Sequence, residues 1–266
     1  MCAAHRRVVL GLHRSRHHRD ILTAALDLGV TALDTAATYL GCRSHEVLRA
    51  TAGDLVPRFA LSTKVGYFEG GHSLAPARLR KAVEQAVMEL GREPDVVLLH
   101  NPEHSQPDAE ALAKACGVLT DAATGGLCES WGISTWDPRS LVDLAAPPPD
   151  VLMVRCGLLV GIDVLEAAEA LVTGWRPRQV WGMSPFGGST SEPVWEKFDP
   201  AMFLRRTSPA SRVQATFRAA FALPVVEAVA VGTDNRKHLR ELVDSLELEV
   251  DDQVVREYRQ LLRQAA

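Results

Sequence analysis

The feature that most constrains this chain is a regular alternation of short apolar runs with longer helical patterns. Several of the short runs, such as VVLL and VLMV, are apolar throughout, which is typical of parallel strands covered on both faces. Eight strands are predicted, at Arg7–Leu12, Val30–Asp34, Phe59–Lys64, Asp95–His100, Ser130–Ser134, Val151–Arg155, Gln179–Met183 and Ala228–Gly232. Helices are predicted over residues 19–29, 44–53, 76–91, 109–125, 138–145, 163–174, 213–223 and 236–247.

Eight strand–helix units without a break in composition predict one (β/α)8 TIM barrel. We expect it to be a single α/β domain that covers residues 1–266, because such barrels need about 250 residues. Residues 66–75 and 184–212 form connections longer than a barrel requires and are rich in Gly, Ser and Pro. Long loops in this architecture usually carry function.

Composition and charge exclude several classes of protein. Lys and Arg number 29 and Asp and Glu 33, so the formal net charge of −4 disfavours binding to nucleic acid or to an anionic membrane. The five cysteines form no CxxC pair, so neither a disulfide framework nor a metal site is predicted. No apolar run approaches the roughly 18 residues of a membrane span. We expect a cytoplasmic protein, a monomer or small homo-oligomer, that binds a small-molecule substrate.

Polar residues end four consecutive predicted strands. These are Asp34, Lys64, His100 and Ser134. Each alone has an ordinary structural explanation, such as a helix cap, a surface charge or a rim residue. The carboxyl ends of barrel strands meet on one face, however, and active sites of this fold lie there. A carboxylate, an ammonium and an imidazole on that face therefore predict a catalytic site.

Local motifs around these residues resemble the aldo-keto reductases. The stretch LDTAATYLG resembles the family's D-x-A-x-x-Y motif, LSTKVG supplies its lysine and LLHNP its histidine. The likeness continues through WGIS, MSPFGG and VAVGTDNRKHLREL, and so covers almost the whole chain. It implies a catalytic tetrad of Asp34, Tyr39, Lys64 and His100. The stretch TKVGYFEGG is most similar to a bacterial, aldose-dehydrogenase-like branch, which implies a sugar-like or other small carbonyl substrate.

The resemblance implies a specific chemistry. Tyr39 would act as general acid in reduction and general base in oxidation, while NADPH (or NADP+) exchanges a hydride with the substrate carbon. A phenol has an unperturbed pKa near 10, so an adjacent Lys64 is expected to lower the pKa of Tyr39. Asp34 would orient Lys64, and His100 would hydrogen-bond the substrate carbonyl.

The resemblance also implies a cofactor site without a G-x-G-x-x-G motif. The residues at its positions are Ser134, Thr135, Met153, Met183, Ser184, Phe186, Gly188, Gly232, Thr233, Asn235, His238 and Glu241. Three of them depart from the family pattern, with Thr135 in place of Asn, Met153 in place of Gln and Met183 in place of a stacking Tyr. A methionine sulfur cannot replace the hydrogen bonds of an amide, so we expect the nicotinamide to bind more weakly than in the family.

These departures leave alternatives open. The chain is either a reductase or a tetrad-bearing lyase, isomerase or dehydratase that uses no cofactor, or else a non-catalytic binding protein. The basic run His13–Arg19 is either a solvated loop or a contact for an anionic ligand. Two further sets have two interpretations each. We expect either a substrate wall or barrel packing from Trp131, Trp136 and Trp181. We expect either surface charges or phosphate contacts from Arg205 and Arg206.

Overall fold

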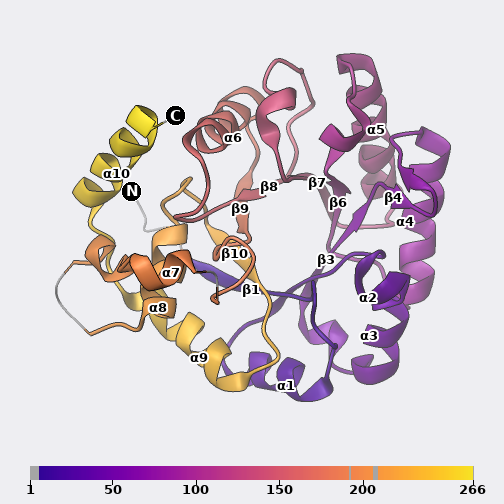
Figure 1. Ribbon diagram of the computed structural model, residues 1–266. Helices are drawn as coiled ribbons and strands as arrows, with labels where there is room; N and C mark the ends of the chain where they lie inside the picture. The colour runs from indigo at the N-terminus through magenta and orange to yellow at the C-terminus, as the bar shows by residue number, and fades with distance from the viewer. Residues whose placement is uncertain (1–5, 192, 206–208, 266) are drawn as a thin grey trace.

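Eight parallel strands close into a barrel in this computed structural model, which describes residues 6–191, 193–205 and 209–265. Around the barrel the order is β1, β10, β9, β8, β7, β6, β3 and β2 (Figure 1). The strands are β1 Arg7–Gly11, β2 Ala32–Asp34, β3 Ala60–Val65, β6 Val96–His100, β7 Ser130–Thr135, β8 Val151–Arg155, β9 Gln179–Met183 and β10 Ala228–Val231. The (β/α)8 prediction is confirmed, and the predicted strands agree with the observed ones to within two residues at either end.

Helices form a ring outside the barrel (Figure 1). They are α1 Arg19–Asp27, α2 Tyr39–Cys42, α3 Ser44–Ala52, α4 Pro76–Leu90, α5 Ala109–Thr124, α6 Ile162–Trp175, α7 Val194–Lys197, α8 Arg212–Ala220, α9 Arg236–Asp244 and α10 Asp252–Ala265. Short 3-10 turns occur at Val56–Arg58, Pro102–Ser105, Pro138–Leu141, Pro200–Phe203 and Ser245–Glu247. Among the described helices, none is long and apolar enough to cross a membrane.

The helix predicted over 138–145 is wrong. The structure has only the 3-10 turn Pro138–Leu141 there, followed by an irregular segment. Pro147, Pro148 and Pro149 begin two residues after the end of the predicted helix. Proline lacks the N–H that a helix needs and disfavours helical backbone at the preceding residue, so the chain crosses to β8 without a full helix. Helix α10 was not predicted, although Val254, Val255, Tyr258, Leu261 and Leu262 follow the spacing of an amphipathic helix.

The two long connections contain structure of their own. In the loop after β3, the strands β4 (Tyr67–Phe68) and β5 (Gly71–His72) pair antiparallel as a small hairpin. The segment after β9 holds α7, where the buried Trp195 donates a hydrogen bond from its indole nitrogen to the carbonyl of Ser189 at 3.0 Å. Both connections leave the carboxyl ends of barrel strands, which is the end where the polar residues gather.

Side-chain direction along the strands decides which residues reach the barrel interior. An apolar cluster fills it, made of Val9, Val96, Leu98, Val151, Met153, Trp181, Ala228 and Ala230. Ser134 of β7 is in register with Met153 of β8, so both side chains point inward. Successive side chains on a strand alternate, and Thr135 therefore points outward to the helices.

Candidate active site

The four predicted tetrad residues come together at the carboxyl end of the barrel. Asp34 ends β2, Lys64 lies near the end of β3 and His100 ends β6. Tyr39 opens the short helix α2 that follows β2. All four line one cavity of about 710 Å3, which is within the usual size range of small-molecule sites.

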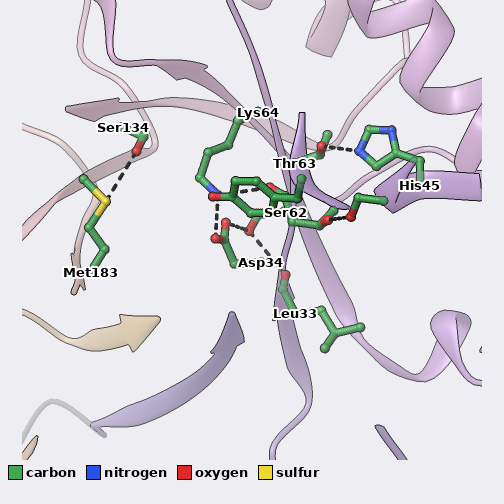
Figure 2. A network of polar contacts seen from close by, with 11 residues as sticks. Leu33, Asp34, His45, Ser62, Thr63, Lys64, Ser134 and Met183 are labelled. Atoms are coloured by element: carbon green, nitrogen blue, oxygen red, sulfur yellow. Dashed lines mark hydrogen bonds and ion pairs between the residues drawn. The ribbon is translucent and has the colours of Figure 1, made fainter. Parts of the chain in front are cut away.

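A buried ion pair organises this site. The Lys64 ammonium donates to Asp34 Oδ2 at 2.5 Å, to the carbonyl of Thr35 at 3.0 Å and to Tyr39 Oη at 3.1 Å (Figure 2). Ser62 Oγ donates to the other carboxylate oxygen of Asp34 at 2.8 Å. Asp34 is 4% exposed and Lys64 3% exposed. Since an ammonium has three protons, every donor of Lys64 is used and its position is fixed.

Burial and charge act in opposite directions on the pKa values here. Burial lowers the pKa of Lys64, but the carboxylate of Asp34 and the oxygen of Tyr39 outweigh it, so the pKa of Lys64 is raised and the side chain stays charged. Burial likewise raises the pKa of Tyr39, and the nearby ammonium only partly offsets this. Lys64 thus lowers the pKa of Tyr39 as expected, but the sequence did not show that burial outweighs this effect and leaves the pKa raised. Tyr39 keeps its proton at neutral pH.

His100 is held as a neutral imidazole. Its pKa lies well below 6.5, first because of burial and then because of the positive charge of Lys64 and the nearby His72 and His104. Its ring stands edge-to-face to that of Tyr39, with the centroids 6.3 Å apart. His72 Nε2 donates to the carbonyl of His100 at 2.8 Å, which fixes the end of β6. The side chains of His100 and Tyr39 can thus both hydrogen-bond one carbonyl group in the cavity.

The predicted cofactor positions divide into two sets. Seven line the cavity, namely Met153, Met183, Ser184, Phe186, Gly188, Gly232 and Thr233. Five are not among the described residues that line it, namely Ser134, Thr135, Asn235, His238 and Glu241. The structure therefore brings the two methionines and the glycine-rich loops into one cavity with the tetrad, and the other five positions are not among its lining residues.

Contacts or burial explain the place of three of these five residues. Ser134 points inward but its hydroxyl faces Met183, with Oγ 3.9 Å from the sulfur (Figure 2). Thr135 is fully buried on the outward face of β7. The Asn235 side chain caps α9 by accepting from the backbone N–H of Lys237 at 2.8 Å. The remaining pair lies on α9 beyond that cap, where His238 is exposed.

Tyr67 and Asn101 are among the cavity residues that sequence reasoning missed. Tyr67, on the β4–β5 hairpin, and Asn101, directly after His100, both line the cavity. Asn101 Nδ2 donates to Tyr67 Oη at 3.3 Å, and Tyr67 Oη is 2.9 Å from His104 Nδ1. The only sequence signal for Tyr67 was its place in a long loop after the lysine strand.

The structure distinguishes the tryptophans of the barrel core from the one that lines the cavity. Trp131 and Trp181 are buried in the barrel, whereas Trp136 is 42% exposed and lines the cavity. The guanidinium of Arg155 lies 5.0 Å from the centre of the Trp136 ring. Trp136 is therefore a positioned aromatic wall.

The structure also decides between some of the interpretations of the two basic segments. His13 and Arg14 line the cavity, so the run His13–Arg19 is not merely a solvated loop. His17 is fully buried, 2.7 Å from Ser44 Oγ. Arg205 lies 3.3 Å from the Glu249 carboxylate, and Arg206 is outside the described residues. In the part of the chain that the structure describes, no group of three His, Cys, Asp or Glu side chains could hold a metal ion.

Known proteins place this architecture in a family. Residues 13–174, which include all four tetrad positions, match the model of the aldo/keto reductase family. Among curated proteins, none matches the chain. The fold is similar to that of an aldo-keto reductase from Bacillus halodurans in its holo form, with a TM-score of 0.74, 19% identity, and coverage of 96% of this chain and 91% of that one.

Two structures from Klebsiella pneumoniae are similar as well. An aldo-keto reductase in complex with NADPH has a TM-score of 0.73 and 18% identity, covering 98% of this chain and 92% of that one. An aldo/keto reductase in complex with NADP and acetate has a TM-score of 0.70 and 18% identity, with the same coverage of 98% and 92%. The family match over residues 13–174 and the shared barrel lead to one conclusion: this chain belongs to the aldo/keto reductase family.

Proposed function

We propose that this protein is an NADP(H)-dependent oxidoreductase that interconverts a small carbonyl compound, sugar-like or otherwise, and its alcohol. The observation that carries the proposal is the buried Asp34–Lys64–Tyr39 array, which shares one cavity with His100. A protonated tyrosine, held by a charged lysine beside a neutral histidine, suits proton transfer to a carbonyl oxygen.

The cavity fits a nicotinamide cofactor. Glycine-rich backbone at Gly188 and Gly232 lines it, and a Cβ at Gly188 would meet no atom within 4 Å, which leaves room for a phosphate. Met153 and Met183 form an apolar floor that suits the face of an aromatic ring. The two Klebsiella pneumoniae structures hold NADPH and NADP, which supports the same class of cofactor here. When bound, NADPH supplies the hydride.

The residues of this chain supply the proton and the charge. His100 donates a hydrogen bond to the substrate carbonyl and places its oxygen beside Tyr39. Tyr39 Oη gives its proton to that oxygen, and the ammonium of Lys64, 3.1 Å away, stabilises the phenolate that remains. Asp34 keeps Lys64 in place through the ion pair. For alcohol oxidation, Tyr39 takes the proton back.

One observation favours a second candidate function. The floor beside the tetrad offers two methionine sulfurs where a nicotinamide amide would need donors and acceptors, and Thr135 is turned away. A lyase, isomerase or dehydratase would need the Tyr39–Lys64 proton chemistry alone. A non-catalytic binding protein would need neither, and the costly buried ion pair disfavours it.

Calorimetric titration of the protein with NADPH and NADH tests the proposal. We expect micromolar binding, followed by NADPH-dependent turnover on a panel of aldehydes, ketones and sugars. No heat of binding up to millimolar concentrations of either nucleotide would overturn the redox function and favour the proton-transfer alternative.

A further inference from the structure

His13 is an imidazole that stands against Tyr39 on the side open to solvent. It follows β1 and lines the same cavity as the tetrad. Its ring meets the Tyr39 ring edge-to-face, with the centroids 5.0 Å apart and the planes at 63°. Tyr39 thus has ring contacts with two imidazoles, of which His13 is exposed and His100 is partly buried.

Every turnover that consumes the Tyr39 proton requires its replacement. Lys64 is buried, and each of its three protons already has an acceptor. Asp34 is buried in the ion pair, and burial keeps the pKa of His100 so low that its ring holds no exchangeable positive charge at neutral pH. Of the two imidazoles in ring contact with Tyr39, His13 is the exposed one and can take a proton from water.

We propose that His13 carries protons between Tyr39 Oη and solvent, a role that rests on the proposed function of Tyr39 as proton donor. After reduction, the imidazolium of His13 gives one proton to the Tyr39 phenolate, directly or through one water, and becomes neutral. The neutral ring then takes one proton from solvent or buffer. In oxidation the same steps run in reverse, so no further reactant is required.

The charges that face His13 favour proton transfer from His13 to Tyr39. Burial lowers the pKa of His13, Arg14 and Lys64 lower it further, and Asp34 partly opposes them, so the pKa lies below 6.5. An imidazolium with a low pKa releases its proton readily, and a phenolate whose pKa is raised by burial accepts it. Transfer from His13 to Tyr39 is therefore downhill, and it should quicken as the pH falls toward 6 because more of His13 is protonated.

The first test measures proton exchange without catalysis. The chain has three tyrosines, and 13Cζ-labelled protein in mixed H2O and D2O gives separate signals for the protonated and deuterated hydroxyls when exchange is slow. We expect His13→Gln to slow exchange at Tyr39 about 100-fold. Tyr258, which donates to the carbonyl of Leu158, serves as the internal reference and should not change. The matched control is His18→Gln, an exposed histidine of the same loop.

The second test separates a relay from a merely structural role. With NADPH and 4-nitrobenzaldehyde as probe, His13→Gln should keep the first turnover at the wild-type rate, since Tyr39 starts protonated, and slow the later turnovers. Added imidazole should restore the later turnovers of His13→Ala. An equal loss in the first and later turnovers would show that His13 only shapes the site and would overturn the relay.

The two tests fail independently. If wild-type protein reduces no carbonyl, the proposed function is wrong, and the exchange measurement still decides the relay. If Tyr39 exchanges at the same rate in wild type and His13→Gln, the relay is wrong whatever the activity.

Discussion

The two sides of the cavity are built on different principles. On the side of β2, β3 and β6, charged and polar groups are buried, and the Asp34–Lys64 pair is hydrogen-bonded to Ser62, Thr35 and Tyr39. On the side of β7 to β10, the interior surface is apolar, with Met153 and Met183 at its centre. One side therefore holds the groups that we propose to transfer the proton, and the other presents a surface with few polar contacts.

Buried charge explains why the first side has little freedom to vary. A buried ion pair is tolerated only with both charges present, so removing either Asp34 or Lys64 should harm the fold as well as the chemistry. A methionine in the apolar layer leaves nothing unpaired, so only a ligand can demand a glutamine or tyrosine there. The tetrad side is thus constrained by folding and function together, and the opposite side by ligand binding alone.

The largest expected effect tests the chemistry of the tetrad side. Tyr39→Phe removes the hydroxyl that receives a hydrogen bond from Lys64, and we expect turnover to fall by about 10²- to 10⁴-fold with the fold intact. Steady-state kinetics and circular dichroism measure the two properties. Tyr258→Phe, far from the cavity, is the control. Near-wild-type turnover of Tyr39→Phe would remove Tyr39 from the mechanism.

The next effect tests the link between charge and folding. Lys64→Met leaves the Asp34 carboxylate buried without its cation, and we expect the free energy of unfolding to drop by about 3–5 kcal/mol in urea titrations. Adding Asp34→Asn should recover most of that loss, because no buried charge remains, while activity stays absent. A single variant within about 1 kcal/mol of wild type would mean that the pair behaves like a surface salt bridge.

The same division explains what could be predicted from the sequence. The barrel follows from a local pattern repeated eight times, and the tetrad follows because parallel strands bring their ends to one face. Asp34, Lys64 and His100 therefore needed no three-dimensional information to be placed together. Met153 and Met183, which were assigned to the cofactor site from the family resemblance, also line the cavity.

What could not be predicted depends on single-residue direction and on burial. Thr135 follows the inward-pointing Ser134 and so faces the helices, a difference of one position that spacing to a motif does not settle. Asn101 reaches the cavity from a left-handed backbone conformation, with φ of 51°. The pKa of Tyr39 rises rather than falls because burial outweighs an adjacent ammonium, and burial is known only once the fold is closed.

A smaller effect is expected from restoring polarity to the apolar side. Met153→Gln places an amide in the cavity floor, and we expect NADPH to bind about tenfold more tightly because the carboxamide gains a partner. The free energy of unfolding should fall by about 1–3 kcal/mol, since the new amide is buried when no ligand is bound. Calorimetry and urea titration measure these changes, with the exposed Met88→Gln as control. Unchanged affinity would mean that the nicotinamide does not lie over Met153.

The smallest effect concerns the pH dependence of stability, which we locate behind the tetrad side. His45 is buried between Thr63, 2.7 Å from its Nε2, and Glu89, 3.0 Å from its Nδ1. Burial lowers the pKa of His45 below 6.5 despite the carboxylate, so the unfolded chain binds more protons than the folded one below that pH.

The contribution of His45 to the free energy of unfolding should therefore be fully present above about pH 6.5. It should decline as the pH falls, by at most about 1.4 kcal/mol per pH unit. Urea titrations between pH 7.5 and 5.5 measure the slope, and His45→Gln, which can still hydrogen-bond Thr63, should reduce it. The exposed His238→Gln is the control and should leave the slope unchanged. A His45→Gln slope equal to that of wild type would move the acid sensitivity away from the tetrad side, to groups elsewhere in the barrel.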